Sequence, residues 1–294
     1  MKSKQILTLD IGGTKIKAAR IKNGKVLTCQ QYPTEKKSAK KFLANLEKII
    51  KNLLDDQIKK IGIGTAGQIY ENGKYVDFLP HFPEGLIKIP LKKRLEKKFG
   101  LPVKIDNDVH CFILAEHKYG AARGLANVIG LTLGTGIGGG IIINKKLYRG
   151  QNNIAGEFGH MIIDPVSNRR CCCGKRGDFE TLAAGPALEL WYKKIAGHKK
   201  STYEISKAAL KNDKQALEAL KLQAKYLGVG ISNLITIFNP QMVVIGGGIA
   251  EIKKLWPLLI KETKKNLPYK KLKHCRLTKA KLGTNAVLVG ASLI

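Results

Sequence analysis

One pattern occurs twice in this 294-residue chain: an apolar run, a turn of glycine and threonine, and a returning apolar run. The first copy is centred on Leu9–Thr14 (Leu-Asp-Ile-Gly-Gly-Thr) and the second on Leu133–Gly138 (Leu-Gly-Thr-Gly-Ile-Gly). Short apolar runs around such turns predict strands that return on themselves. We therefore expect two similar α/β halves, each with a phosphate-type turn, forming a cleft with a nucleotide between them.

The first half alternates predicted strands and helices. Asn23-Gly24 is a hairpin signal between two of the strands, and Ser38 is a candidate cap for the first helix, whose leucines and isoleucines have helical spacing. The expected strands are 5–9, 16–21, 26–32, 61–65 and 103–105, and the expected helices are 38–54, 91–99 and 108–119. This order indicates an α/β domain with a mixed sheet.

The pattern starts again in the second half. Strands are predicted at 128–133 and 140–143, and a long core-facing helix at 217–238 is ended by an Asn-Pro pair. A buried strand at 242–245 then runs into three glycines. This half therefore also combines a glycine turn with strands and a helix.

Length and composition are those of a folded protein of about two domains. A hydrophobic fraction of 44% argues against a disordered chain. We expect an N-terminal α/β domain of residues 1–106 and a C-terminal α/β domain of residues 107–283. A helix at 284–294 is expected to pack back on the first domain.

The formal net charge is +30, because 52 Lys and Arg residues face 22 Asp and Glu residues. Only eight of the cations are Arg, and the lysines occur as pairs scattered over the whole chain. A nucleic-acid site concentrates its positive charge in one patch, often with Arg, so this pattern indicates a solvated surface and no nucleic-acid partner. Such a field still attracts anionic ligands such as nucleotides or polyphosphate.

Six cysteines are too few and too clustered for a secreted disulfide scaffold. Three are consecutive, Cys171–Cys173, and with His160 upstream they indicate a metal site in a reducing compartment. Polar residues interrupt the N-terminal apolar stretch, which argues against a signal peptide. The longest uncharged run, 126–143, holds six glycines, which argues against a membrane span. We expect a cytoplasmic protein without a membrane partner.

Glycine turns after strands allow backbone N–H groups to approach phosphate oxygens closely, because no Cβ intervenes. Thr14 and Thr135 add hydroxyl donors to the two turns. Asp10 ends the first strand, where a carboxylate can hold Mg²⁺ through water. Two alternatives stay open at this point: the glycines form plain tight turns, and Asp10 bonds its own backbone as a turn former.

Taken together, the motifs resemble those of the ROK family (repressors, open reading frames, sugar kinases) over essentially the whole chain. In order they are Asp10–Thr14 with Ala18, Asn107-Asp108 ahead of Ala115-Glu116, Gly134–Gly140, Ala155–His160, Cys171–Gly177 and Ile245–Gly248. The resemblance implies an actin-like, ribonuclease-H-like ATPase fold whose two domains close over a sugar. It also implies a kinase that uses ATP and Mg²⁺, commonly as a homodimer or homotetramer.

The resemblance implies that the glycine turns bind the nucleotide. The residues implied are Asp10, Gly12, Gly13, Thr14 and Lys15 in the first half, and Gly134, Thr135, Gly136, Gly247 and Gly248 in the second half. The last two are implied to lie near the adenosine.

Asp108 is the candidate catalytic base. It begins the predicted helix 108–119, whose positive end favours the ionised carboxylate. A weak base suffices, because phosphoryl transfer passes through a loose transition state that needs positioning more than proton removal. Asp108 would accept the proton of a sugar hydroxyl while that oxygen attacks the γ-phosphorus, and Asn107 would bind another hydroxyl. From the residues alone, a pair that merely caps the helix is equally compatible, and the resemblance favours catalysis.

The resemblance also implies sugar-contacting residues and a structural zinc site. The substrate residues implied are Gly67, Asn107, Asp108, Glu157, His160 and Glu180, and the zinc ligands implied are His160, Cys171, Cys173 and Asp178. Zinc would fix the loop that presents the two glutamates. The family's fourth ligand is usually a Cys, and Asp178 stands in its place, while Cys172 is an extra thiol. The alternative is a metal-free loop of free thiols in which His160 is a core histidine.

Three positions near the expected sugar pocket depart from the family pattern. His81 and His110 stand where Asn is common, and Leu86 stands where Trp is common. The sugar therefore stays open. We expect an ATP-dependent hexose kinase of carbohydrate metabolism, with glucose at its 6-hydroxyl as the first candidate and N-acetylhexosamines or fructose as alternatives.

Two further functions are compatible with the same motifs. A polyphosphate-dependent glucokinase would exploit the positive charge, but polyphosphate-using relatives usually lack the cysteine motif. A sugar-responsive transcriptional regulator would carry a DNA-binding segment before Asp10, where only nine residues stand.

Overall fold

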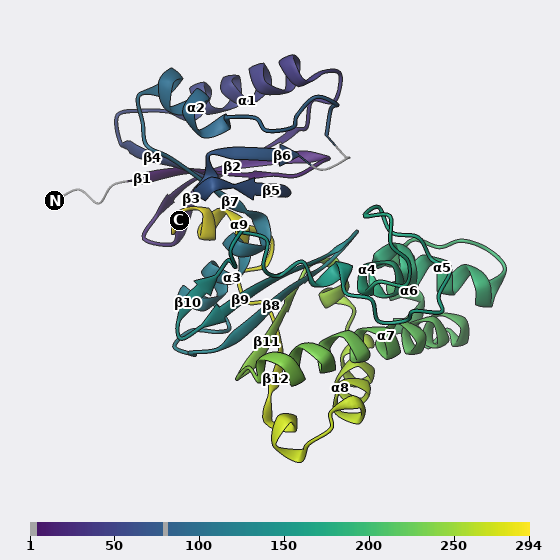
Figure 1. The fold of residues 1–294 in the computed structure, drawn as a ribbon. Coiled ribbons are helices and arrows are strands. Elements are labelled where there is room, and N and C mark those ends of the chain that lie inside the picture. Colours follow the sequence, from purple (N-terminus) through teal and green to yellow (C-terminus); the bar gives the residue numbers. More distant parts are fainter. Residues whose placement is uncertain (1–4, 79–81) are drawn as a thin grey trace. The chain divides into compact units, whose positions relative to one another are not determined.

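The computed structural model describes residues 5–78 and 82–294, which form two compact units (Figure 1). Unit 1 comprises the described residues up to Arg123 together with Leu147–Ala155 and Lys281–Ile294. Unit 2 comprises Gly124–Lys146 and Gly156–Ala280. The chain therefore passes between the units at four places.

Unit 1 is built on a five-stranded sheet with the strand order β3-β2-β1-β4-β7. Its strands are β1 (Gln5–Ile11), β2 (Lys15–Lys22), β3 (Lys25–Pro33), β4 (Ile58–Thr65) and β7 (Val103–Asn107). The first three are antiparallel neighbours, whereas β4 runs parallel to β1 and β7 runs parallel to β4. The mixed sheet predicted from the sequence is therefore confirmed. Asn23 and Gly24 both have positive φ, as the predicted hairpin between β2 and β3 requires.

Helices cover both faces of this sheet (Figure 1). They are α1 (Ala39–Leu53), α2 (Leu91–Phe99), α3 (Asp108–Lys118) and α9 (Ala286–Ala291). Apolar side chains of α1 and α2, among them Phe42, Leu46 and Leu91, share one buried core with β1 and β4. The short helix α9 contacts β1, β4 and α3 on the other face.

The contact of α9 with the sheet depends on two glycines. A Cβ at Gly62 of β4 would lie 1.9 Å from the carbonyl oxygen of Ala291, and a Cβ at Gly290 would lie 1.7 Å from that of Cys111 in α3. Larger residues at either position would force the backbones apart. Unit 1 is completed by β5 (Gly67–Tyr70), β6 (Tyr75–Phe78) and the short helices η1 (Glu71–Gly73) and η5 (Gly283–Asn285).

Unit 2 repeats the plan with a second five-stranded sheet, ordered β10-β9-β8-β11-β12. Its strands are β8 (Val128–Leu133), β9 (Ile137–Ile143), β10 (Lys146–Tyr148), β11 (Met242–Gly246) and β12 (Arg276–Lys279), and of β10 only Lys146 belongs to unit 2. Strands β8 and β9 are antiparallel, and β8, β11 and β12 are parallel. The carboxyl ends of β8 and β11 therefore lie at the same edge, where each runs into a glycine turn.

The helices of unit 2 all follow β8, β9 and β10 in the chain. They are η2 (Phe158–His160), α4 (Phe179–Ala183), α5 (Gly185–Ala196), α6 (Thr202–Leu210), α7 (Lys214–Phe238), η3 (Gly248–Glu251), α8 (Leu255–Asn266) and η4 (Lys270–His274). The long helix α7 begins at its cap Asp213 and ends at Asn239, which adopts the left-handed conformation before Pro240. The predicted helix 217–238 is thus confirmed.

The structure assigns several segments differently from the predicted domain limits. Residues 107–123 and 147–155 belong to unit 1, whereas the limits 1–106 and 107–283 placed them in the second domain. The last helix lies in unit 1, as does the start of α3 with its candidate base. Eight of the nineteen predicted site residues are therefore carried by unit 1 and eleven by unit 2.

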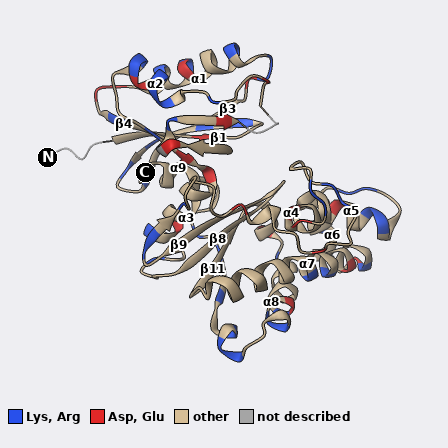
Figure 2. Ribbon diagram, in the orientation of Figure 1, with Lys and Arg blue, Asp and Glu red and all other residues tan. Residues whose placement is uncertain are grey.

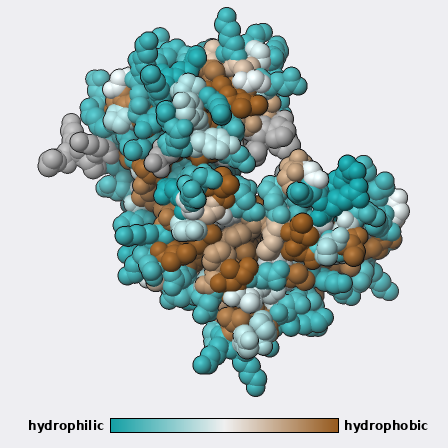
Figure 3. All heavy atoms as spheres, in the orientation of Figure 1, coloured by the Kyte–Doolittle hydropathy of each residue, from teal (hydrophilic) through white to brown (hydrophobic). Residues whose placement is uncertain are grey.

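The surface reflects the charge of the chain. Lys and Arg occur on helices of both units (Figure 2), and the exposed face in Figure 3 is largely hydrophilic. Within the described ranges, no helix combines the length and apolar character that crossing a membrane requires.

Candidate functional site

The first glycine turn connects β1 to β2 and is held by backbone and hydroxyl hydrogen bonds. The N–H of Gly12 donates to the carbonyl of Lys15 (3.0 Å), and the Thr34 hydroxyl donates to the carbonyl of Gly12 (2.7 Å). The N–H of Thr34 donates to the carbonyl of Thr14 (3.0 Å). These bonds fix the turn, while Thr14 and Lys15 stay exposed and Gly13 half-buried. The turn can therefore offer backbone N–H groups, a hydroxyl and an ammonium group to an anion.

Asp10 lies on β1 just before this turn, opposite Lys17 of β2 and Gly64 of β4. Burial, and then the negative charge of Asp108, raise the pKa of Asp10 to about 7, while Lys17 and Lys15 act in the opposite direction. The two carboxylates, one on a strand and one at a helix start, therefore lie close enough to repel each other. A divalent cation beside them would relieve that repulsion and favour the ionised form of both.

Asn107 and Asp108 stand at the junction of β7 and α3. Both side chains accept a hydrogen bond from the N–H of Val109, at 2.8 Å for Asn107 and 2.9 Å for Asp108. The Asn107 amide also donates to the carbonyl of Gly67 (3.3 Å). The capping function considered from the sequence is therefore present. It uses Oδ1 of each side chain and is compatible with a second function at the same residues.

Gly67 itself is a structural requirement of the small β5–β6 hairpin. Its φ is +141°, and a Cβ there would lie 2.5 Å from the carbonyl oxygen of Asp77. The hairpin thereby places the Gly67 carbonyl beside Asn107. The structure thus brings three of the predicted substrate residues together within unit 1: Gly67, Asn107 and Asp108.

The second glycine turn connects β8 to β9 in unit 2. The N–H of Gly134 donates to the carbonyl of Gly136 (3.0 Å), and the Gly134 carbonyl accepts from the N–H of Gly185 at the start of α5 (2.8 Å). Glu180 of α4 contacts the same turn, because its Oε2 accepts from the N–H of Ile137 (2.8 Å). A Cβ at Gly136 would lie 2.4 Å from that oxygen, so only glycine fits there without displacement. Thr135 is exposed at the tip.

The third glycine motif follows β11 and lies against the end of β8. Gly247 has a φ of +88°, and a Cβ there would lie 2.2 Å from the carbonyl oxygen of Leu133. Gly247 and Gly248 are both exposed, and nothing lies within 4 Å of a Cβ built on Gly248. Two glycine turns therefore meet at the carboxyl ends of adjacent parallel strands, which is the edge where α/β sheets bind their ligands.

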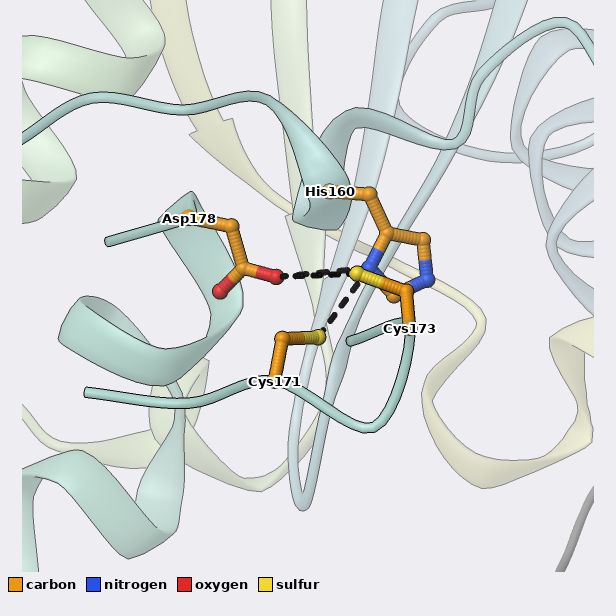
Figure 4. A group of neighbouring side chains, drawn as sticks. All are labelled: His160, Cys171, Cys173 and Asp178. Atoms are coloured by element: carbon orange, nitrogen blue, oxygen red, sulfur yellow. Dashed lines mark hydrogen bonds and ion pairs between the residues drawn. The ribbon is translucent and has the colours of Figure 1, made fainter. Parts of the chain in front are cut away.

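Four side chains of unit 2 converge as metal ligands would: His160, Cys171, Cys173 and Asp178 (Figure 4). Their ligand atoms all lie within 4.8 Å of one another. His160 Nδ1 is 3.4 Å from Cys171 Sγ and 3.4 Å from Asp178 Oδ2, and Cys173 Sγ is 3.9 Å from Asp178 Oδ2. A tetrahedral zinc with bonds of about 2.0–2.3 Å separates its ligand atoms by about 3.3–3.8 Å. The donor set and its spacing therefore fit zinc.

Asp178 has two functions in this arrangement. It is fully buried, and its Oδ1 accepts from the N–H of Thr181 (2.9 Å), which caps α4, while its Oδ2 faces the sulfur and nitrogen ligands. Burial would raise the pKa of Asp178, but hydrogen bonds from Cys171 and Thr181 outweigh it and lower that pKa. Burial, and then the hydrogen bond to Asp178, raise the pKa of Cys171. A bound metal would reverse this and hold the thiol as a thiolate.

The extra thiol and the remaining sugar residues lie around this group. Cys172 Sγ is 3.9 Å from Cys171 Sγ, and the pair forms an alternative ligand group with Glu180. Glu157 is exposed and immediately precedes η2, and its carbonyl accepts from the N–H of His160. His160 directs Nδ1 at the metal ligands, so Nε2 is the nitrogen that could meet a substrate.

Two of the unusual positions can be located. Leu86 is buried in the core of unit 1, and His110 is buried in α3 beside Asp106. His81 lies outside the described residues. No sequence feature selects Arg149, which the structure places on the Asp106 carboxylate (2.6 Å). An arginine before a glycine in a polar loop carries no signal that would have identified it.

The chain belongs to the ROK family, whose model matches residues 6–294. It is 33% identical to a glucokinase of Streptomyces coelicolor over 83% of this chain and 81% of the relative. It is 31% identical to an N-acetylmannosamine kinase of Haemophilus influenzae (strain PittGG) over 97% of this chain and 93% of the relative.

Solved structures agree with this assignment. A ROK family glucokinase from Streptomyces griseus in complex with glucose and AMPPNP has a TM-score of 0.86 and 31% identity, covering 98% of this chain and 97% of that one. A ROK family transcriptional regulator, a homologue of the Escherichia coli MLC protein, has a TM-score of 0.90 and 26% identity, covering 99% and 78%. The actin-like, ribonuclease-H-like fold expected from the motifs is confirmed, and the chain is a sugar kinase of this family.

Proposed function

We propose that this kinase transfers the γ-phosphoryl group of ATP to the 6-hydroxyl of glucose, with Asp108 as the base. The observation that carries the proposal is the placement of Asp108 at the start of α3, next to Asn107 and within electrostatic reach of Asp10 and the first glycine turn. A hydroxyl-binding amide, a base and a candidate cation ligand thus stand together in unit 1.

The reaction follows from these groups. The sugar hydroxyl oxygen forms a bond to the γ-phosphorus as the bond between that phosphorus and the ADP oxygen breaks, and the Asp108 carboxylate accepts the hydroxyl proton. Asn107 donates to a neighbouring hydroxyl and orients the sugar. The backbone N–H groups of both glycine turns are proposed to bind the phosphates, with Thr14, Thr135 and Lys15 as side-chain donors.

Asp10 is the residue proposed to hold Mg²⁺, with Asp108 as its acidic neighbour. The raised pKa of Asp10 supports this, because a cation beside two mutually repelling carboxylates lowers their energy. Mg²⁺ bound with ATP neutralises charge on the transferred phosphoryl group.

Glu157, His160 and Glu180 are proposed to bind sugar hydroxyls, and His160 with Cys171, Cys173 and Asp178 is proposed to hold a structural zinc. The fit of the four ligand atoms supports the zinc site. Because Asp178 caps α4 and Glu180 is the second residue of that helix, zinc would fix the position of a sugar ligand.

Glucose is preferred over N-acetylmannosamine because the glucokinase of Streptomyces coelicolor is 33% identical and the similar Streptomyces griseus glucokinase structure is a complex with glucose and AMPPNP. The N-acetylmannosamine kinase, similar over 97% of the chain, makes an N-acetylhexosamine the second candidate. The test is coupled ADP release with Mg·ATP across a panel of glucose, mannose, fructose, N-acetylglucosamine and N-acetylmannosamine. If another hexose is clearly preferred, that hexose takes the place of glucose as the proposed substrate. If none of the sugars stimulates ADP release, the proposal is contradicted.

The phosphoryl donor, the cellular setting and the oligomeric state are proposed as well. ATP is preferred to polyphosphate because of the cysteine group, and comparing rates with the two donors tests the choice. All six cysteines are free thiols in the structure, which supports a reducing, cytoplasmic location. A homodimer or homotetramer is proposed from the family and is tested by light scattering.

A further inference from the structure

A buried charged cluster lies directly behind the proposed catalytic pair. Its centre is the Asp106 carboxylate, which is 3% exposed and accepts four hydrogen bonds. Oδ1 accepts from the N–H of Asn107 (2.8 Å) and from His110 Nδ1 (2.8 Å). Oδ2 accepts from Nε (3.1 Å) and Nη2 (2.6 Å) of Arg149. The carboxylate is therefore fully coordinated, and one of its partners is the backbone of the sugar-binding residue.

The cluster keeps this carboxylate ionised. Burial alone would raise the pKa of Asp106, but the hydrogen bonds and charges of His110 and Arg149 outweigh it and hold the pKa below its usual value. A buried ion that loses one partner leaves an uncompensated charge, which is more disruptive than removal of an exposed pair. The cluster thus makes the position of Asp106, and with it the Asn107–Asp108 turn, dependent on His110 and Arg149.

Two ends of one distant loop are tied to this cluster. Arg149 stands 43 residues from Asp106 in the chain, and the Ala155 carbonyl, 45 residues from His110, lies 3.2 Å from His110 Nε2. The N–H of Ala155 donates to the carbonyl of Arg149 (3.1 Å), which closes the loop. All of these groups belong to unit 1. The same loop continues in the chain to Glu157, two residues after Ala155.

His110 is suited to this function because each of its two ring nitrogens faces a buried polar group. Its two partners, a carboxylate and a carbonyl, are both acceptors. An Asn at this position has one donor group, which could serve Asp106 or Ala155 but is too short to reach both. A ring without nitrogen atoms would serve neither and would leave a buried carboxylate and a carbonyl short of partners.

We propose that Asp106, His110 and Arg149 are positioning residues of the kinase reaction, which fix the Asn107–Asp108 turn and tie it to the loop 149–155. The proposal rests on the proposed function of Asp108. A reacting group displaced by about 1 Å loses about 100-fold in rate, so loosening this turn lowers turnover even though no member of the cluster touches the reacting atoms.

The experiment compares kcat and KM for Arg149→Met, Arg149→Lys, His110→Phe and His110→Asn. The matched control is Arg20→Met, because Arg20 in the same unit also pairs with an aspartate, Asp55 (2.6 Å), and donates to a backbone carbonyl. We expect R149M and H110F to lower kcat about 10–100-fold with KM for ATP changed less than about twofold. R149K and H110N should recover part of the loss, and R20M should keep the wild-type kcat.

Backbone hydrogen exchange of residues 107–110 provides a readout that does not need activity. We expect R149M and H110F to speed exchange there while R20M leaves it unchanged. If R149M lowers kcat no more than R20M, or if exchange at 107–110 stays at the wild-type rate in R149M and H110F, the proposal is overturned. If wild-type protein turns over no sugar, the proposed function fails, and hydrogen exchange still decides whether the cluster fixes the turn.

Discussion

Asp178 offers a test in which helix capping and metal binding can be separated. Its Oδ1 caps α4 through Thr181, and its Oδ2 faces the other three ligands. Asp178→Ser keeps a capping oxygen but removes the carboxylate ligand, whereas Asp178→Ala removes both. Losing the cap costs about 1 kcal/mol of unfolding free energy. Losing one zinc ligand lowers affinity at least about tenfold, which corresponds to about 1.4 kcal/mol.

These magnitudes predict a distinct pattern of melting temperatures. One kcal/mol shifts the Tm of a domain of 150–250 residues by about 2–4 °C. After chelation, D178S should melt close to wild type and D178A about 2–4 °C lower. With excess zinc, which stabilises any form that binds it when folded, wild type should rise above both variants, by about 3–6 °C over D178S.

The assay is thermal unfolding with and without chelator, together with the zinc content of each purified variant. Asp178→Cys, which supplies the more usual ligand, should bind zinc at least as tightly as wild type. The reasoning is refuted if wild type binds no zinc and chelator leaves its Tm unchanged. It is refuted for Asp178 alone if D178S keeps both the zinc and the full zinc-dependent rise in Tm.

Three further outcomes are expected. Asp108→Asn should lower kcat about 10²–10⁴-fold while nucleotide affinity by calorimetry stays near wild type, and a wild-type kcat would show that the base is another residue. Gly136→Ala, whose Cβ would lie 2.4 Å from Glu180 Oε2, should raise KM for ATP with a smaller effect on Tm, and unchanged kinetics would remove the turn from the nucleotide site. The lowered pKa of Asp106 means that its charged contacts contribute stability above the ordinary carboxyl pKa of about 3.9 and lose it as pH falls through the lower, folded-state pKa. The Tm advantage of wild type over R149M should therefore be present at pH 5–7 and shrink in acid, and a difference independent of pH would contradict this sign.

Local patterns predicted much of the scaffold because the physical causes are local. The helix predicted at 91–99 is α2, ended by Gly100 in the left-handed conformation, and Ser38 caps α1 by accepting from the N–H of Lys41. The apolar run before the second glycine turn located β8, and helical spacing located α7. The resemblance to the ROK family implied His160, Cys171, Cys173 and Asp178 as zinc ligands, and these side chains do converge.

Other features depend on contacts that no local pattern records. The strand predicted at 140–143 begins at Ile137, because the glycines before it serve packing instead of a turn: a Cβ at Gly139 would lie 2.2 Å from the Phe158 ring. The Asp106 cluster could not be predicted, since its arginine is 43 residues away. The function of Glu180 at the turn is likewise a long-range contact, 43 residues from Ile137.

Within unit 2, long-range contacts connect the metal-ligand group to the glycine turns. Asp178 faces the metal ligands and caps α4, and Glu180 of the same short helix accepts from Ile137 at the second glycine turn. The Gly134 carbonyl of that turn in turn accepts from the start of α5, and Gly247 packs against the end of β8 that leads into it. Asp178, which would bind a metal at the cysteine group, is thus two residues before Glu180, whose Oε2 holds the second glycine turn. The link runs through the buried carboxylate of Asp178 and the side chain of Glu180, so we expect an occupied metal group to order the second glycine turn together with Glu180, a proposed sugar ligand.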